Sequence, residues 1–114
     1  MVEEGFPPSA RLKRSVDFQR IQKTGHRFHT KSFVVCYAAG SAQEVRFGLT
    51  VSRRVGNAVT RNRVKRWVRE GIRRSQHDLS SADVVFIAKP KSALRTQQLV
   101  ALEVLDAIRR IERA

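Results

Sequence analysis

The most informative segment of the sequence lies at the centre of the chain, where residues 52–74 read SRRVGNAVTRNRVKRWVREGIRR. Gly56 and Asn57 suit a turn, and a helix is expected to run from about Asn57 to Ser75. At about 100° per residue, the small and apolar residues of this helix fall on one arc, which holds Val64, Trp67, Val68, Gly71 and Ile72. The pattern predicts a helix that packs through this arc onto a core, with Trp67 as a core residue.

The opposite arc of the same helix is cationic. It carries Asn62, Lys65, Arg66, Arg69 and Arg73, with Arg61 at its edge. Surface helices usually pair opposite charges four residues apart, whereas like charges stacked on one face destabilise a helix unless anions lie between them. The one acid of the helix, Glu70, is off this arc. A solvated face is the alternative, but the pattern favours binding to phosphates, with Asn62 available to hydrogen-bond a sugar, base edge or phosphate.

The segment before this helix alternates in the manner of a half-buried strand. Within Glu44–Ser52, one face is expected to be core and carries Val45, Phe47, Leu49 and Val51. The other face is small and mostly polar, with Arg46, Gly48, Thr50 and Ser52. This second face leaves room for a ligand to lie on the sheet. Arg53 and Arg54 follow the strand, beside a helix N-terminus whose free amides favour anions.

The remaining elements follow from shorter patterns. A first helix should run from Ser15, a plausible N-cap, to Gly25, and Phe33–Ala39 and Asp83–Ala88 should be strands. A last helix should run from about Thr96 to Arg113 with the apolar stripe Leu99, Leu102, Leu105, Ile108 and Ile111. We expect an α/β (α+β) two-layer sandwich in which three helices pack on a small mixed sheet of about four strands, in the order α-β-β-(β)-α-β-α.

Length and composition bound the class of protein. A chain of 114 residues fits one domain, which we expect over 11–114 after a flexible tail at 1–10. No apolar run approaches the roughly 20 residues that span a bilayer, and Met1–Ala10 lacks the pattern of a signal peptide. The single Cys36 excludes an internal disulfide and fits a reducing compartment, so the cytoplasm is the expected location.

The charge predicts a polyanionic partner. Lys and Arg number 23 against 10 acids, for a net charge of +13. Between Phe18 and Arg69 the single acid is Glu44. Such a one-sided excess is typical of a nucleic-acid-binding domain. A membrane surface would need an amphipathic helix with an exposed apolar face, and the helices here need their apolar faces for the core.

No pattern predicts catalysis or metal binding by the chain itself. His26, His29 and Cys36 lack the fourth ligand and the spacing of a zinc site. The sequence shows no carboxylate pair, no nucleophile with a base and no phosphate-binding glycine loop. Phe18 can be read equally as a core residue or as a ring that binds a ligand.

The chain resembles a known family, the protein subunits of bacterial ribonuclease P. The resemblance rests on Arg61–Arg66 within GNAVTRNRVKRWVRE, flanked by FGLTVSRRVGNA upstream, DFQRIQKTG near the N-terminus and DVVFIAKP downstream. Four blocks in the family's order run from Arg11 to the last helix. An RNA-binding module such as a ribosomal protein would explain the charge but not these blocks. A DNA-reading helix would predict a dimer and base-reading side chains.

The resemblance implies that an RNA subunit and a protein subunit have different roles. A catalytic RNA subunit, using bound Mg²⁺, cuts the 5′ leader from precursor tRNA, and the protein subunit alone is inert. The implied partners are that RNA and precursor tRNA, with no membrane and no obligate protein partner. The residues implied to bind RNA are Arg61, Asn62, Arg63, Lys65, Arg66, Arg69 and Arg73, and those implied for a leader-binding cleft are Phe18, Thr50, Arg53, Arg54 and Cys36. The family also has a left-handed crossover between two parallel strands.

Two positions depart from the family pattern. An aromatic residue often stands four residues after Phe18 and at the position of Cys36, where this chain has Gln22 and the thiol. Tyr37 is adjacent to Cys36 but should point to the other face of a regular strand. We therefore expect the leader cleft of this chain to rely less on base stacking at these positions.

Overall fold

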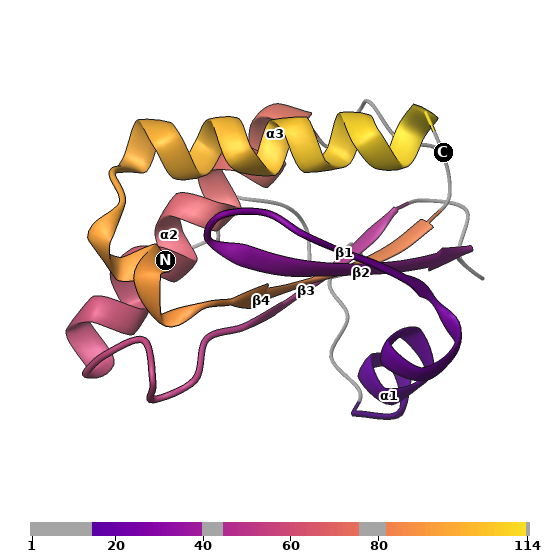
Figure 1. Cartoon of the computed structure of the whole chain (residues 1–114), viewed down its shortest axis with the longest axis horizontal. Helices are drawn as coiled ribbons and strands as arrows, with labels where there is room; N and C mark the ends of the chain where they lie inside the picture. The colour runs from indigo at the N-terminus through magenta and orange to yellow at the C-terminus, as the bar shows by residue number, and fades with distance from the viewer. Residues whose placement is uncertain (1–14, 40–44, 76–81, 114) are drawn as a thin grey trace.

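The structure is a computed structural model that describes residues 15–39, 45–75 and 82–113. Along the chain the elements are α1 (Ser15–Thr24), β1 (His26–His29), β2 (Phe33–Ala39), β3 (Arg46–Thr50), α2 (Ala58–Ser75), β4 (Ala82–Ala88), the 3₁₀ helix η3 (Pro90–Leu94) and α3 (Gln97–Arg113) (Figure 1). The tail expected over 1–10 lies outside the described residues.

The four strands form one mixed sheet in the order β1-β2-β4-β3. Both β1 with β2 and β2 with β4 pair antiparallel, while β3 and β4 pair parallel. The chain joins the two parallel strands through α2, so the expected crossover connection is present. Its handedness stays a prediction.

Helices lie on both faces of the sheet. The pair α2 and α3 covers one face and α1 lies against the other (Figure 1). The main core fills the space under α2 and α3, where Phe33, Phe47 and Phe86 are at most 1% exposed. The expected sandwich thus describes the sheet with α2 and α3, and α1 adds a smaller contact on the opposite side.

Helix α2 begins and packs as its sequence predicts. The Asn57 side chain accepts a hydrogen bond from the Thr60 amide at 2.9 Å, as an N-cap does. The predicted apolar arc is buried, and Trp67 packs half-buried against the core. A Cβ at Gly71 would lie 2.8 Å from the Val104 side chain, so the glycine allows α2 and α3 to approach closely.

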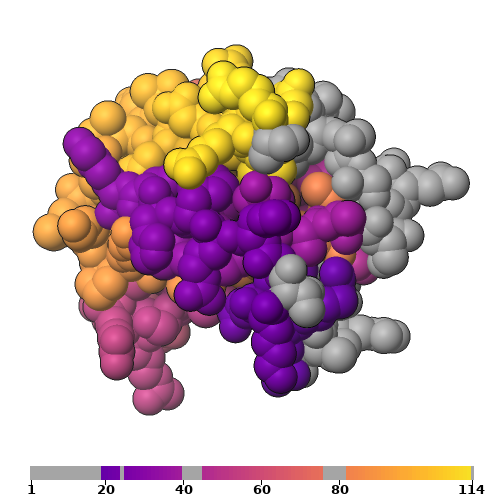
Figure 2. Space-filling model, turned by 45° about the vertical axis from the view of Figure 1, so that its right-hand side comes forward, coloured from indigo at the N-terminus to yellow at the C-terminus, as the bar shows by residue number. Residues whose placement is uncertain are grey.

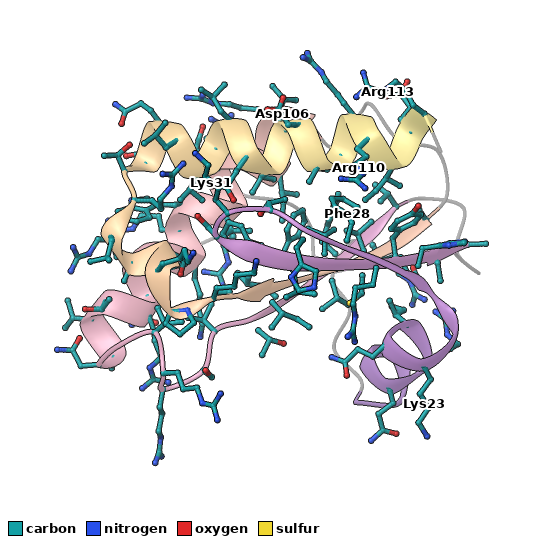
Figure 3. All side chains as sticks on the ribbon, in the orientation of Figure 1. Lys23, Phe28, Lys31, Asp106, Arg110 and Arg113 are labelled. Atoms are coloured by element: carbon teal, nitrogen blue, oxygen red, sulfur yellow. The ribbon has the colours of Figure 1, made fainter. Side chains whose placement is uncertain are left out.

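No position was predicted for strand β1 from the sequence. Its four residues, HRFH, hold one apolar side chain, Phe28, too little to form a recognisable alternation. Phe28 is buried, and the Arg110 guanidinium of α3 lies 4.2 Å from its ring centroid. Figure 3 shows Arg110 above Phe28, with the helix holding the edge strand.

The stripe predicted for α3 is wrong in part. Leu99 and Leu102 are 43% and 55% exposed, whereas Val100, Val104 and Ile108 are fully buried. Residues spaced by three fall about 60° short of a full turn at each step, so the predicted stripe winds around the helix. A stripe with spacing near 3.6 stays on one face, and that is the one the core buries.

Candidate nucleic-acid interface

The cationic arc of α2 faces away from the core. Asn62 and Arg66 of the arc are exposed, as is Arg63 beside it, while Lys65 and Arg69 of the arc and Arg61 at its edge are half-buried. The Nε of Arg61 is covered and has no hydrogen-bond partner. The most accessible charges therefore belong to Arg63 and Arg66, and Arg61 contributes to the surface through the end of its side chain.

The C-terminal end of this arc is partly neutralised. Glu70 accepts hydrogen bonds from Arg73 at 2.5 Å and from Arg74 at 3.0 Å. The bond from Arg73 lowers the pKa of Glu70 against the effect of burial, and Arg74 lowers it further. Glu70 was predicted to lie off the arc, yet its side chain reaches Arg73. Arg73 is therefore a weaker candidate for binding phosphate than the exposed residues of the first two turns.

Two further cations stand between β3 and α2. Arg53 and Arg54 are exposed in the turn that follows β3. The turn is closed by the Val55 amide, which donates to the Ser52 carbonyl at 3.1 Å. The first amides of α2 follow directly, so this corner combines two guanidinium groups with a helix N-terminus, as the sequence predicted.

The pairing register identifies the part of the sheet that α1 leaves open. Residues paired directly across strands point to the same face. One such row crosses all four strands, and we call it the open row: His29, Val34, Ile87 and Thr50. Val34 and Ile87 are half-buried, and the two end residues are exposed. Thr50 thus lies on an open face, as predicted, beside an apolar strip.

The next row along the sheet is covered. Cys36 and Val85 pair across β2 and β4 and lie at 1% and 0% exposure, packed with Ile21 of α1. Cys36 was predicted to line a cleft, but its side chain is closed off beneath α1 and contributes packing. Tyr37 points to the opposite face, as predicted, and packs against the main core.

A buried carboxylate fastens α1 to the sheet. Asp83 of β4 is fully buried and accepts hydrogen bonds from Arg46 of β3 at 2.9 Å. It also accepts one from Arg20 of α1, 63 residues away in the chain. Sequence reasoning missed this group, because no local pattern indicates a pairing over such a distance. Phe18 belongs to α1, but its side chain lies outside those that the structure describes.

Together these features give one concave side to the molecule. Figure 2 shows α1, in indigo, projecting from the body and separated by an indentation from the end of α2. Residues of the strands lie at the bottom of the indentation. Of the predicted leader-cleft residues, Thr50 lies on the α1 side of the sheet and Arg53 and Arg54 follow it in the turn, whereas Cys36 lies under α1.

The described residues carry neither a metal site nor a membrane span. Across 15–39, 45–75 and 82–113, no three His, Cys, Asp or Glu side chains gather as a metal ion would require. His26 stacks on Tyr37, with ring centroids 5.2 Å apart. Within the same ranges, no helix has the length and apolar character needed to cross a bilayer.

Comparison with known proteins adds an independent line. A family model described as Ribonuclease P matches residues 6–112. The ribonuclease P protein component of Desulfovibrio desulfuricans is 39% identical over 113 residues, covering 95% of this chain and 87% of the relative. That of Staphylococcus haemolyticus is 39% identical over 79 residues, which is 69% of each chain. The solved RNase P protein of Staphylococcus aureus superposes with a TM-score of 0.81 at 32% identity, covering 90% of this chain and 94% of that one.

Proposed function

The chain belongs to the ribonuclease P protein family, and we propose that it binds the ribonuclease P RNA through α2 and holds the 5′ leader of precursor tRNA on the open side of its sheet. The family match extends over residues 6–112, nearly the whole chain. An RNA-binding module of the ribosomal kind is therefore not favoured. Cytoplasmic tRNA processing is the setting that fits a basic chain with one cysteine.

The exposed cations of α2 are the observation that carries the proposal. Arg63 and Arg66 lie on the first turns of a helix whose one acid, Glu70, is already paired with Arg73 and Arg74. Phosphates between these side chains would relieve the repulsion of like charges. Contacts of this kind position a nucleic acid without reading its sequence, which suits a protein that docks on one large folded RNA.

The second part of the proposal, binding of the leader, rests on the open row and on Arg53 and Arg54 beside it. Half-buried Val34 and Ile87 offer apolar surface for the bases of a single strand, and Thr50 offers a hydroxyl. Arg53 and Arg54 stand at the end of β3 for the phosphates. Proteins that bind single strands combine these two features, a basic track and a surface for bases.

We assign the bond cleavage to the RNA subunit, together with the Mg²⁺ that the reaction uses. Metal-bound water is a stronger nucleophile than free water, and the ion would supply it at the RNA subunit. The protein then contributes binding and orientation. Its side chains hold the leader in register with the cleavage position.

Reconstitution tests the proposal. The protein with its cognate RNA and Mg²⁺ should cleave precursor tRNA to the mature 5′ end, and the protein alone should not. Replacing exposed Arg63 and Arg66 with Ala should weaken binding to the RNA subunit and reduce the slope of log affinity against log salt by about two units. Arg109→Ala with Arg113→Ala removes the same charge from the exposed side of α3 and serves as the matched control.

An equal change of slope in both double variants would show that net charge, and not the α2 surface, governs binding. Sustained cleavage of precursor tRNA by the protein free of RNA would contradict the assignment of the chemistry.

A further inference from the structure

Strand β1 carries two exposed histidines with different surroundings. His26 stacks on Tyr37 at an interplanar angle of 29°. His29 is exposed, and among the described residues no hydrogen bond, ion pair or ring contact holds its side chain. The two imidazoles differ because successive residues of a strand point to opposite faces, and three positions separate them.

The register places His29 on the same side of the sheet as the proposed leader site. Its direct partner on β2 is Val34, the second member of the open row. The residue before it, Phe28, points the other way and lies under Arg110 of α3. His29 is therefore the end of the open row, three strand spacings of about 4.8 Å from Thr50.

The backbone that follows His29 is held by hydrogen bonds. The Thr30 amide donates to the Phe33 carbonyl at 2.8 Å, and the Lys89 ammonium donates to the Thr30 carbonyl at 2.7 Å. Glu103 of α3 accepts hydrogen bonds from the Thr30 hydroxyl at 2.7 Å and from the Ser32 amide at 2.9 Å. An exposed ring on a fixed backbone binds a ligand at a smaller entropic cost than one on a mobile loop.

We propose that His29 is a further leader-binding residue, whose imidazole stacks on a base of the single-stranded leader at the β1 end of the open row. The proposal rests on the proposed function, since it extends the same site by one strand. The ring lies next to the apolar surface of Val34, so a base resting on Val34 and Ile87 reaches it without leaving the sheet. Every base has a π-face, so contact of this kind tolerates any leader sequence.

The test uses the enzyme assembled with its RNA subunit and compares affinity for precursor tRNA with affinity for mature tRNA. His29→Ala should weaken binding of the precursor about fivefold or more, the lower end of the range for loss of one stacked base, and leave mature tRNA unchanged. His29→Phe, which keeps a ring, should retain most of the affinity. His26→Ala is the matched control on the same strand and should change neither affinity.

Two results would overturn the proposal. If His29→Ala binds both tRNAs as the wild type does, while Thr50 and Arg53 variants lose preference for the leader, then the leader site stands and His29 is not part of it. If the wild-type enzyme itself shows no preference for the leader, the proposed function fails as well. Thermal melting of each variant shows whether the fold is intact, which is expected because His29 is exposed.

Discussion

The two faces of the sheet differ in how much of their surface is buried. Under α2 and α3, the core includes four phenylalanines and a set of buried valines and isoleucines. Under α1, the buried apolar residues that the structure describes are Ile21, Cys36 and Val85, and the open row beside them stays accessible. A small domain obtains its stability from one side of the sheet, which leaves the other side available for a ligand.

A substitution in the core under α2 and α3 should have the largest effect on stability. Phe86 is fully buried and packs edge-on against Phe33, with ring centroids 6.0 Å apart. Phe86→Ala should lower the free energy of unfolding by about 3–5 kcal/mol, measured by urea denaturation. Leu94→Ala, at a site 86% exposed, should change it by less than about 0.5 kcal/mol. Equal losses in the two variants would mean that the core is wrongly placed.

Asp83 should come next, because it joins α1 to the sheet. Asp83→Ala removes a buried acceptor from two guanidinium groups, but Arg20 and Arg46 are 38% and 20% exposed and can be hydrated. We expect a loss of about 1–3 kcal/mol, below the range for fully buried pairs. Affinity for the leader should fall more than affinity for the RNA subunit, because the cluster lies on the α1 face of the sheet and α2 covers the opposite face. Wild-type stability in Asp83→Ala would contradict the role of this cluster in holding α1.

Phe18→Ala distinguishes a ligand-binding ring on α1 from a core residue. If the ring stacks on a base, affinity for precursor tRNA should fall by up to about 1–3 kcal/mol, with mature tRNA and RNA-subunit binding unchanged. If the ring is core, stability should fall by about 3–5 kcal/mol and all binding should weaken together. Thermal melting alongside the two tRNA affinities separates these outcomes.

The smallest effect concerns Glu70 and the end of the α2 arc. Its pKa is lowered in the folded state, chiefly by the hydrogen bond from Arg73. Its contribution is therefore present above the unfolded-state pKa and is lost as the pH falls through the lowered value. Because the pair is on the surface, we expect Glu70→Gln to cost about 0.3–0.5 kcal/mol at neutral pH. The difference from wild type should vanish in acid, and a difference that persists there would contradict this origin.

The features that the sequence predicted are those with a local pattern. The 18-residue helix α2 shows a periodic apolar arc, and β2 is a continuous apolar run. The features it missed depend on contacts between distant segments. Phe28 of β1 lies under Arg110 of α3, and Asp83 is paired with Arg20 across 63 positions. The open row can be identified only from the register of the four strands.

The burial of Cys36 has the same origin. The family resemblance implied a cleft residue, and whether Cys36 lines the cleft depends on which part of the sheet α1 covers. Ile21 packs over Cys36, while Val34, two residues earlier on the same face, stays half-exposed. The position of one helix, fixed by Asp83, thus decides which residues remain available to a ligand.

Photo-crosslinking from the leader tests most directly the claim that the half-covered face is the binding face. Precursor tRNA carrying a photoreactive thiouridine in its 5′ leader would be bound to the assembled enzyme, irradiated, and the attached peptides identified by mass spectrometry. We expect attachment to residues of the open row and the adjoining turn, namely His29, Val34, Ile87, Thr50 and Arg53. Attachment instead to the exposed side of α3, at Leu99 and Leu102, would contradict the assignment of the two faces.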